Sequence, residues 1–352
     1  AERHDARIGA TDLAPFPETR AEFDRRIETG ASGSLGFTYG DPALATEPLR
    51  SFPWASSLVV AAVPYLRDGD GDTGDPRSVA RFADDDRYEP LRMVLAEIAA
   101  TLEAEGHRTE EVFDDGRLVD RAVAIRAGVA WAGKSTMALT PGHGPWFLIG
   151  TVVTDADIEA TRPMQRTCGT CDACIPACPT GAIVAPGVLD ARRCLAAIFQ
   201  SRGPIPVAVR ESAGVRVYGC DDCLTACPPG HQALQTLGAA SPPDAADLLA
   251  RSDAELDATF AHWYVPGRSM RFIRRNAIVA VGNGGSANDL GLLGGYLGHP
   301  DALLRGHAAW AIGRIGGELA EGMLDVAASA ESDATVSREI ALAREMAADR
   351  LR

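Results

Sequence analysis

All eight cysteines of the chain lie between residues 168 and 227. Four of them form the run CGTCDACIPACP, with two, two and three residues between successive cysteines and a proline after the last. A second group, CDDCLTACP, follows at residues 220–228. This spacing is typical of bacterial ferredoxins that hold two cubane iron–sulfur clusters. The cysteines therefore predict that the chain transfers electrons through iron–sulfur clusters.

The ferredoxin pattern also predicts which cysteines share a cluster, because the fourth cysteine of each run binds the other cluster. One 4Fe-4S cluster is then expected on Cys168, Cys171, Cys174 and Cys227. The other is expected on Cys178, Cys194, Cys220 and Cys223, with Cys194 replacing the first cysteine of the second run. Zinc is the alternative, since two CxxC pairs can make one tetrahedral site. Zinc would leave four thiols without a role, so we favour two clusters.

The basic residues of this acidic chain are almost all arginines. The formal net charge is −14, which disfavours broad non-specific binding to nucleic acid because phosphate contacts need Lys and Arg. Only Lys134 is a lysine, and it stands in GVAWAGKS (128–135), which matches the P-loop pattern. A P-loop must follow a strand, whereas the preceding DRAVAIRAG reads as a helix. We therefore expect a different loop, one that holds an anionic or amide-rich group.

The first 160 residues alternate between strand and helix patterns. SSLVVAAVPYL (56–66) and GPWFLIGTVVTD (144–155) are apolar, β-branched runs that predict buried strands. Residues 84–107 predict a helix from about Pro90, with apolar residues three and four positions apart. This alternation indicates an α/β layer domain over residues 1–160, followed by a ferredoxin-like domain over 161–235.

The remaining residues, 236–352, predict a helical domain with a weak internal repeat. RRNAIVAVGNGG (274–285) matches RGHAAWAIGRIGG (305–317) at an offset of 31 residues. A period of this size is typical of HEAT-like helical arrays, although a simple helical cap is the alternative. Within this region, RSMRFIRR predicts a helix face that presents Arg268, Arg271 and Arg275 to nucleic-acid phosphates. A solvated basic face is the alternative interpretation.

Nothing in the sequence predicts a membrane segment or an export signal. No apolar run approaches the roughly 20 residues that a membrane-spanning helix needs. The first residues, AERHDARIGATDLAPF, lack the basic and then apolar pattern of a signal peptide. We therefore expect a cytoplasmic protein that does not contact a membrane.

Several blocks of the sequence, taken in order, resemble the epoxyqueuosine reductases, which complete queuosine in tRNA with cobalamin and iron–sulfur clusters. The early blocks are GSLGFTY (33–39) and VARFADDDRY (79–88). The most specific block is FDDGRLVDRAVAIRAGVAWAGKST (113–136), which is joined to the cysteine runs. RRNAIVAVGN (274–283) completes the resemblance. The family resemblance implies an N-terminal cobalamin-binding domain, two 4Fe-4S clusters and HEAT-like repeats.

The resemblance also implies a mechanism and a set of site residues. An external donor, such as a flavodoxin or ferredoxin system, would reduce the clusters, which would pass electrons to cobalamin. The substrate would be epoxyqueuosine in the anticodon region of tRNA. The acid of the family matches Asp114, with the adjacent Asp115 as the rival. The residues that match the cobalamin-contacting segment of the family are Arg121, Trp131, Lys134 and Ser135, with Tyr88 as a further candidate.

The chain departs from the usual family pattern at Glu89, where the family has His, and at Pro228–Gly230, where the family has Pro-Trp-Asn. Two other hypotheses therefore remain. One is a corrinoid iron–sulfur reductase that acts on a small molecule. The other is an electron-transfer module without a catalytic pocket, which binds a partner protein through its helical array.

Overall fold

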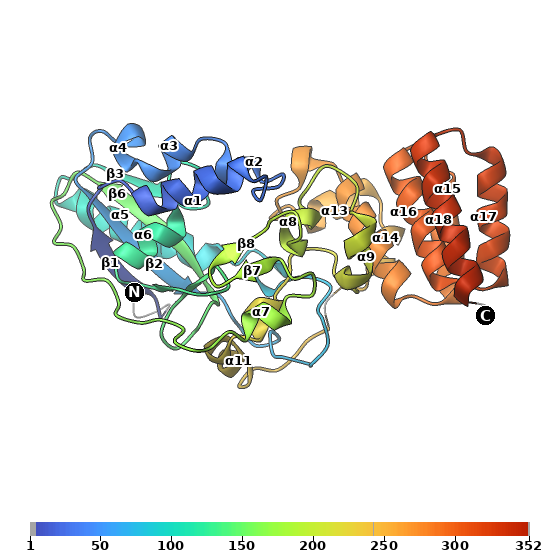
Figure 1. Cartoon of the computed structure of the whole chain (residues 1–352). Coiled ribbons are helices and arrows are strands. Elements are labelled where there is room, and N and C mark those ends of the chain that lie inside the picture. The colour runs from blue at the N-terminus through green and yellow to red at the C-terminus, as the bar shows by residue number, and fades with distance from the viewer. Residues whose placement is uncertain (1–4, 242, 351–352) are drawn as a thin grey trace. The chain divides into compact units, whose positions relative to one another are not determined.

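The computed structural model describes residues 5–241 and 243–350, which form two compact units. The first unit takes in Ala1–Thr73, Asp86–Cys194 and Asp221–Ala240. The second takes in Gly74–Asp85, Leu195–Cys220 and Ser241–Arg352. Figure 1 follows the chain through these segments. The three domains predicted from the sequence, 1–160, 161–235 and 236–352, do not coincide with these two units. Their boundaries stay a prediction.

A four-stranded antiparallel sheet forms the centre of the first unit, with strand order β1-β2-β6-β3. Its strands are β1 (Arg7–Thr11), β2 (Ser57–Pro64), β6 (Phe147–Thr154) and β3 (Thr109–Val112). Strands β2 and β6 confirm the two buried strands predicted from sequence. Because every pairing is antiparallel, this α/β layer domain is not built from parallel βαβ units.

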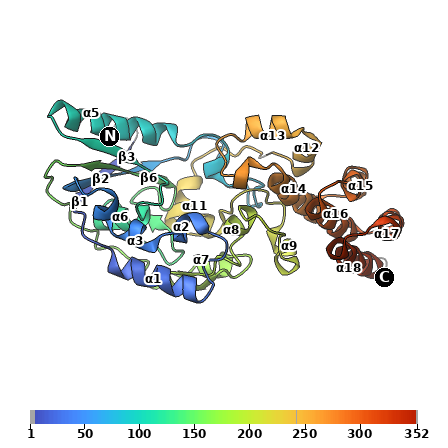
Figure 2. The same cartoon turned by 90° about the horizontal axis from the view of Figure 1, so that it is seen from above.

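Alternate residues of β2 belong to two separate apolar cores, one on each face of the sheet. Leu58 and Val60 pack with the helix α6 (Asp120–Arg126), whereas Val59 and Ala61 pack with the helix α5 (Glu89–Ala104). Figure 2 shows α5 on one side of the sheet and α6 on the other. The short helices on the α6 side are α1 (Pro17–Glu28), α2 (Gly36–Tyr39), α3 (Pro42–Thr46) and α4 (Pro48–Ser51).

Helix α5 confirms the predicted helix and is held to the sheet by its apolar face. Leu91, Val94 and Leu95 are at most 1% exposed. Burial of each such side chain contributes about 1.5–3 kcal/mol, taken against a fully exposed chain. The helix begins with Pro90 in its first turn, where the missing N–H costs no hydrogen bond.

Small elements surround the cysteines. The hairpin β4 (Trp131–Ala132) and β5 (Ala138–Leu139) precedes them, and β7 (Ile183–Ala185) and β8 (Val188–Leu189) follow the first run. One helical turn, α7 (Cys174–Ala177), leads to Cys178, and another, α10 (Asp222–Thr225), leads to Cys227. Both of these cysteines have extended backbones, as residues before proline prefer. The two runs therefore have matching local structure, and α11 (Pro228–Leu234) follows the second.

The regular elements of the second unit are helices and helical turns, within the residues that the structure describes. It begins with the single turn η2 (Arg81–Ala83) and the helices α8 (Leu195–Phe199) and α9 (Val207–Ala213). Next come α12 (Ala245–Ala250), α13 (Asp253–Thr259), the turn η3 (Pro266–Arg268) and α14 (Arg271–Gly284). The turn η4 (Ala287–Asp289) then leads to the last four helices, α15 (Leu290–Leu297), α16 (Ala302–Ile315), α17 (Glu318–Ala330) and α18 (Ala334–Arg350).

The predicted 31-residue repeat corresponds to helices α14 and α16, which pack against each other. The matching glycines mark the contacts, because a Cβ on Gly282 would lie 2.8 Å from Cα of Ala311. A Cβ on Gly313 would lie 2.7 Å from Cα of Ala343 in α18. Both separations are below the contact distance of carbon atoms, so each glycine lets one helix approach the next closely.

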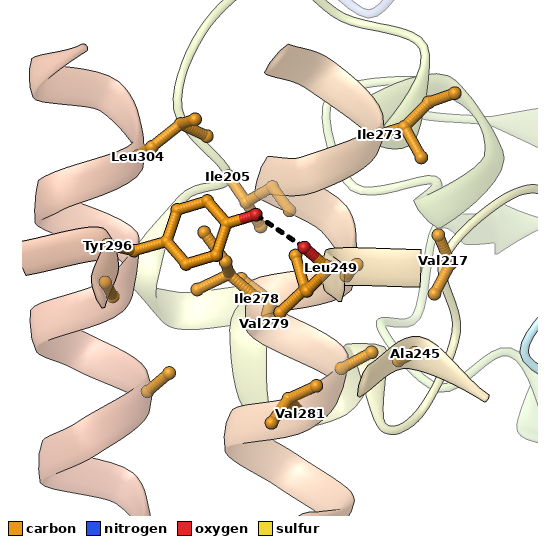
Figure 3. Packing of buried hydrophobic residues seen from close by; sticks show 14 of the residues in the cluster. Ile205, Val217, Ala245, Leu249, Ile273, Ile278, Val279, Val281, Tyr296 and Leu304 are labelled. Carbon is orange, nitrogen blue, oxygen red and sulfur yellow. Dashed lines mark hydrogen bonds between the residues drawn. The ribbon is translucent and has the colours of Figure 1, made fainter. Parts of the chain in front are cut away.

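One continuous apolar core joins the helices of the second unit. Figure 3 shows part of this core, in which Ile278 and Val279 of α14 lie near Leu249 of α12 and Tyr296 of α15. The Tyr296 hydroxyl donates a hydrogen bond to the Leu249 carbonyl oxygen at 3.0 Å, which satisfies its buried polar end. No helix within residues 5–241 and 243–350 has the length and apolar character needed to cross a membrane.

Candidate functional site

A cavity of about 340 Å³ opens in the first unit beside the sheet. Its walls come from α1, α2, α3, the start of α6, the strand β6 and the loop that precedes α6. Most lining side chains are apolar, and they include Phe23, Phe37, Leu118, Val119, Met137 and Phe147. The polar lining side chains are Thr19, Thr38, Tyr88, Asp114, Asp115, Asp120 and Arg121. An apolar pocket with a few converging polar groups is the usual form of a small-molecule site.

Asp114, the predicted acid, lies on the loop between β3 and α6 and lines this cavity. Its backbone φ is +46°, an uncommon conformation that Asp tolerates better than most residues. The Tyr88 hydroxyl donates a hydrogen bond to Asp114 Oδ2. The Tyr88 ring in turn packs against Phe113, with ring centroids 5.9 Å apart. The carboxyl is therefore positioned by one hydrogen bond and still meets solvent.

Asp115, the rival acid, is paired with an arginine. Arg117 donates to Asp115 Oδ2 from Nη2 at 2.6 Å and from Nε at 2.9 Å. These hydrogen bonds from Arg117 hold the pKa of Asp115 below its usual value. A carboxyl that stays ionised does not serve as a general acid, so the geometry favours Asp114.

Asp120, which the sequence analysis did not select, is a third carboxyl of this cavity. Its Oδ1 atom is buried and has no hydrogen-bond partner in the described part of the chain. Burial raises the pKa of Asp120 well above its ordinary value, and the charge of Asp114 adds to this while Arg121 opposes it. The only signal in the sequence was an acidic residue directly before Arg121 in the most specific block.

The predicted cobalamin contacts divide into two groups. Tyr88 and Arg121 line the cavity, whereas Trp131, Lys134 and Ser135 belong to the hairpin beside it and are not among the lining residues. Arg121 joins the two groups, because its Nη1 atom donates to the Thr136 carbonyl oxygen at 3.2 Å.

Two of the three predicted contacts in the hairpin are buried, because Trp131 and Ser135 are each 8% exposed. Ser135 Oγ accepts a hydrogen bond from the Met137 backbone N–H at 3.4 Å. Lys134 extends away from the hairpin, and its Nζ atom donates to the Gly169 carbonyl oxygen at 2.8 Å. As a P-loop this segment fails, because it follows helix α6 and forms a hairpin.

The positions at which the chain departs from the family pattern lie apart from the cavity lining. Glu89 is exposed at the start of α5. Gly230 is buried in α11, where its carbonyl oxygen accepts a hydrogen bond from Trp146 Nε1 at 2.8 Å. These departures therefore change the surroundings of the cavity rather than its wall.

None of the eight cysteines, all of which the structure describes, forms a disulfide bond. Burial raises the pKa of Cys227, and the neighbouring thiols of Cys168, Cys174 and Cys171 raise it further. Burial likewise raises the pKa of Cys174, with further contributions from Cys168 and Cys171. Cys227 is thus within electrostatic range of the first run, as the predicted sharing of that cluster requires.

Cys178 has a different environment from the other three cysteines of its run. Burial opposes ionisation, but hydrogen bonds from the backbone N–H groups of Ile183, Ala182 and Thr180 and from the Thr180 hydroxyl outweigh it and lower the pKa of Cys178. The Ala182 nitrogen lies 3.1 Å from Cys178 Sγ. Such donors stabilise a thiolate, the form that binds metal. The grouping of Cys178 with Cys194, Cys220 and Cys223 stays a prediction.

Within residues 5–241 and 243–350, no three Cys, His, Asp or Glu side chains converge closely enough to hold one metal ion. A cubane cluster binds one thiolate on each of four irons, so its ligands surround the cluster instead of meeting at a single ion.

The predicted basic face over 268–275 does not form. Arg268 lies in the turn η3 with φ +50°, before helix α14 begins, and Gly267 also has a positive φ. Its guanidinium bonds to Asp257 and to the Trp263 carbonyl oxygen. Arg271 forms an ion pair with Asp301 at 2.8 Å.

Arg275 is fully buried. Its guanidinium donates to backbone carbonyl oxygens around the end of α8, including those of Ser201 and Phe199. Arg275 is therefore a structural residue rather than a phosphate contact, which corrects the prediction. Arg268 and Arg271 keep partly exposed side chains and stay candidates.

The chain is similar to known proteins over most of its length. Residues 167–230 match the family model of a 4Fe-4S double cluster binding domain. An epoxyqueuosine reductase of Bacillus subtilis is 34% identical over 352 residues, which cover 95% of this chain and 90% of the relative. One of Xanthomonas campestris is 35% identical over 337 residues, or 88% of this chain and 92% of the relative.

Solved structures extend the likeness to three dimensions. An epoxyqueuosine reductase bound to an epoxyqueuosine-modified tRNA-Tyr stem loop matches with a TM-score of 0.87 and 31% identity, over 97% of this chain and 95% of that one. A Bacillus subtilis epoxyqueuosine reductase whose aspartate-bearing catalytic loop is swung out of the active site matches with a TM-score of 0.84 and 33% identity, over 97% and 94%. From the cysteine runs, the cavity and these whole-length matches, the chain belongs to the epoxyqueuosine reductase family of oxidoreductases.

Proposed function

We propose that this chain is a cobalamin-dependent reductase that converts epoxyqueuosine to queuosine in the anticodon region of tRNA. Two 4Fe-4S clusters would relay electrons from an external donor, such as a flavodoxin or ferredoxin system. The cytoplasm, where tRNA is modified, is the proposed location. Helices α14–α18 would form the HEAT-like part of the fold. The relative that is bound to a modified tRNA stem loop supports the choice of substrate.

The observation that carries this proposal is the position of Asp114. Its carboxyl lines a mainly apolar cavity and is positioned by the Tyr88 hydroxyl. A volume of about 340 Å³ lies within the range of small-ligand pockets, so the cavity suits a base-sized group. By its sequence motif, the loop of Asp114 also matches the aspartate-bearing catalytic loop of the Bacillus subtilis relative.

The residues present fit a corrinoid with amide side chains. Arg121 offers guanidinium donors at the cavity wall, and the Asp120 Oδ1 atom is a buried oxygen that lacks a partner. Amide groups pair well with both kinds of atom. We therefore assign Tyr88 and Arg121 to the cavity side of the cobalamin site, and Trp131, Lys134 and Ser135 to the hairpin that supports it. Bound cobalamin would supply a reduced cobalt centre able to attack an epoxide carbon.

The protein's own part in the reaction is to provide protons and exclude water. Removing the epoxide oxygen as water, with formation of the alkene, consumes two electrons and two protons. Asp114 would give a proton to the departing oxygen, because it is the exposed carboxyl of the cavity lining and is oriented by the Tyr88 hydroxyl. Tyr88 would orient Asp114, and the apolar side chains around it would keep solvent away from the reacting carbon.

The direct test uses the full chain, reconstituted under anaerobic conditions with iron, sulfide and cobalamin. The loaded protein is incubated with epoxyqueuosine-containing tRNA and a reductant, and the digested nucleosides are analysed by mass spectrometry. We expect queuosine to appear only when tRNA, cobalamin and reductant are all present. Bound cobalamin without any queuosine would contradict the tRNA assignment and favour a small-molecule substrate. Failure to bind a corrinoid would favour the electron-transfer module.

A further inference from the structure

The hairpin formed by β4 and β5 is attached to the cysteine-bearing segment at three places. Lys134 Nζ donates to the Gly169 carbonyl oxygen at 2.8 Å. The Gly187 backbone N–H, in the turn between β7 and β8, donates to the Lys134 carbonyl oxygen at 2.8 Å. The Arg166 guanidinium lies 5.5 Å from the centre of the Trp131 ring. The hairpin therefore contacts the chain both before and after the first cysteine run.

Among these contacts, only that of Lys134 places a charged group directly against the loop that carries the cysteines. Gly169 follows Cys168 and turns the chain toward Cys171 with φ +52°. The ammonium group is hydrogen-bonded to the backbone of this turn, whereas the nearby Arg166 is placed over an aromatic ring. A negative charge also lies on this loop, because Asp172 directly follows Cys171.

A cation in this position has a definite electrostatic consequence. An iron–sulfur cluster becomes more negative when it accepts an electron, so a nearby positive charge stabilises the reduced form. Net charge and hydrogen bonds near the sulfurs are two of the factors that set cluster potentials. The effect is strong where the cation is held close to the ligands, since attraction falls with distance and is screened by solvent.

We propose that Lys134 sets the reduction potential of the cluster held by Cys168, Cys171, Cys174 and Cys227. Its charge keeps that cluster easier to reduce inside a chain whose net charge is −14. Lys134 is thus a positioning and tuning residue of the electron path, in addition to any contact with cobalamin. This inference rests on the cluster binding in the proposed function, but not on cobalamin or on the tRNA substrate.

The test is a redox titration of the full-length protein after anaerobic cluster reconstitution, followed by electron paramagnetic resonance. Lys134→Gln removes the charge and keeps an N–H donor for Gly169, whereas Lys134→Arg keeps the charge. We expect Lys134→Gln to shift one of the two midpoint potentials to a more negative value, and Lys134→Arg to restore it. Arg50→Gln is the matched control, because Arg50 is an exposed cation on α4 that pairs with Glu47, and neither midpoint should move.

Three outcomes would overturn the inference. They are an unchanged midpoint in Lys134→Gln, an equal shift in Lys134→Arg, or an equal shift in Arg50→Gln. Iron and sulfide analysis confirms that each protein is loaded, and Lys134→Met replaces the glutamine variant if that one does not load. Wild-type protein that forms no cluster at all would contradict the proposed function, and this result is distinguishable from a failure of the Lys134 inference.

Discussion

Three carboxyl groups within seven residues have three different environments. Asp115 is held as a carboxylate by Arg117, whereas the Oδ1 atom of Asp120 is buried and has no hydrogen-bond partner in the described part of the chain. Asp114 lies between these extremes, in contact with one hydroxyl and with solvent. Local environment, rather than residue type, therefore decides which of the three is suited to give up a proton during turnover.

Replacement of Asp114 by Asn separates proton donation from binding. Asn has nearly the same shape and still accepts a hydrogen bond from Tyr88, but it carries no acidic proton. We expect Asp114→Asn to retain cobalamin and both clusters while kcat falls by about 10²–10⁴-fold, the usual contribution of a general acid. Queuosine formation measured by mass spectrometry, with absorbance spectra to confirm loading, checks this. Asp115→Asn is the matched variant, and a larger loss of kcat there would transfer the role to Asp115.

The buried carboxyl of Asp120 predicts a pH-dependent stability. Burial raises the folded-state pKa above that of the unfolded chain, so the folded protein binds more protons between the two values. Its contribution to the free energy of unfolding therefore falls as the pH rises through this interval. Asp120→Asn, which cannot ionise, should lose less stability over the same range.

Urea unfolding at several pH values, from about 4 to 8, measures this difference. Asp114, Asp115 and Arg121 also act electrostatically on Asp120, so Asp114→Asn is the reference for changes caused by a neighbouring charge. Parallel stability curves for wild type and Asp120→Asn would show that Asp120 ionises normally in the folded protein.

At the scale of helices, close packing depends on residues without side chains. Gly313 in α16 leaves no space for a Cβ, because that atom would lie 2.7 Å from Cα of Ala343. Gly322 in α17 is also inside a helix, but a Cβ there would meet nothing within 4 Å. Both glycines therefore lie inside helices, but only Gly313 is packed against a neighbouring helix.

This pair makes a controlled prediction about stability. We expect Gly313→Ala to lower the free energy of unfolding by about 1–3 kcal/mol, because α18 must move away from α16. Gly322→Ala should raise it by up to about 1 kcal/mol, since alanine favours the helix and finds open space. Thermal unfolding followed by circular dichroism compares the two. Equal effects of the same sign would show that helix propensity, rather than packing, controls both positions.

The elements that could be predicted from sequence are those with strong local patterns. The apolar runs of β2 and β6 and the periodicity of α5 predicted each element within a few residues. The predicted face of Arg268, Arg271 and Arg275 failed because positive φ angles at Gly267 and Arg268 keep Arg268 out of α14. Burial of Arg275 depends on packing against α8, about 75 residues earlier, which no local pattern reports.

The site shows the same division. The motif identified Asp114 because its residue type and spacing match the family. Asp120 was missed because the burial of its Oδ1 atom depends on tertiary packing. Likewise, the contact between Lys134 and the cysteine loop joins residues 35 positions apart. Long-range contacts such as these decide what a polar side chain does, and they are absent from a single sequence.

At the scale of the whole molecule, the net charge of −14 sets a condition on the proposed binding of tRNA. Phosphates are repelled by most of the chain, so affinity must come from a local group of arginines and should fall steeply with salt. Arg275 is excluded from that group by its burial. The proposed electron path has the same requirement for local positive charge, because an acidic chain disfavours reduction of its clusters, and Lys134 offsets this locally.

The last prediction concerns cysteines that lie far apart in the sequence but are expected to bind the same cluster. Cys227 lies 59 residues after Cys168, yet the two thiols are electrostatically coupled in the fold. If the ferredoxin rule holds, Cys168→Ala and Cys227→Ala should each lose the same cluster and retain the other. Cys178→Ala should instead lose the cluster that Cys168→Ala keeps. The iron and sulfide content of each variant should fall by about half.

Electron paramagnetic resonance of the reduced variants distinguishes the two clusters by their spectra. Matching spectra for Cys168→Ala and Cys227→Ala, and a different spectrum for Cys178→Ala, would establish the crossed arrangement. Matching spectra for Cys178→Ala and Cys168→Ala would instead mean that each run binds its own cluster. The crossed arrangement has a physical consequence, since each cluster then joins the two cysteine runs and loss of either cluster loosens both. Limited proteolysis of the single-cluster variants should therefore cut both the 168–178 and the 220–227 segments faster than in the wild type.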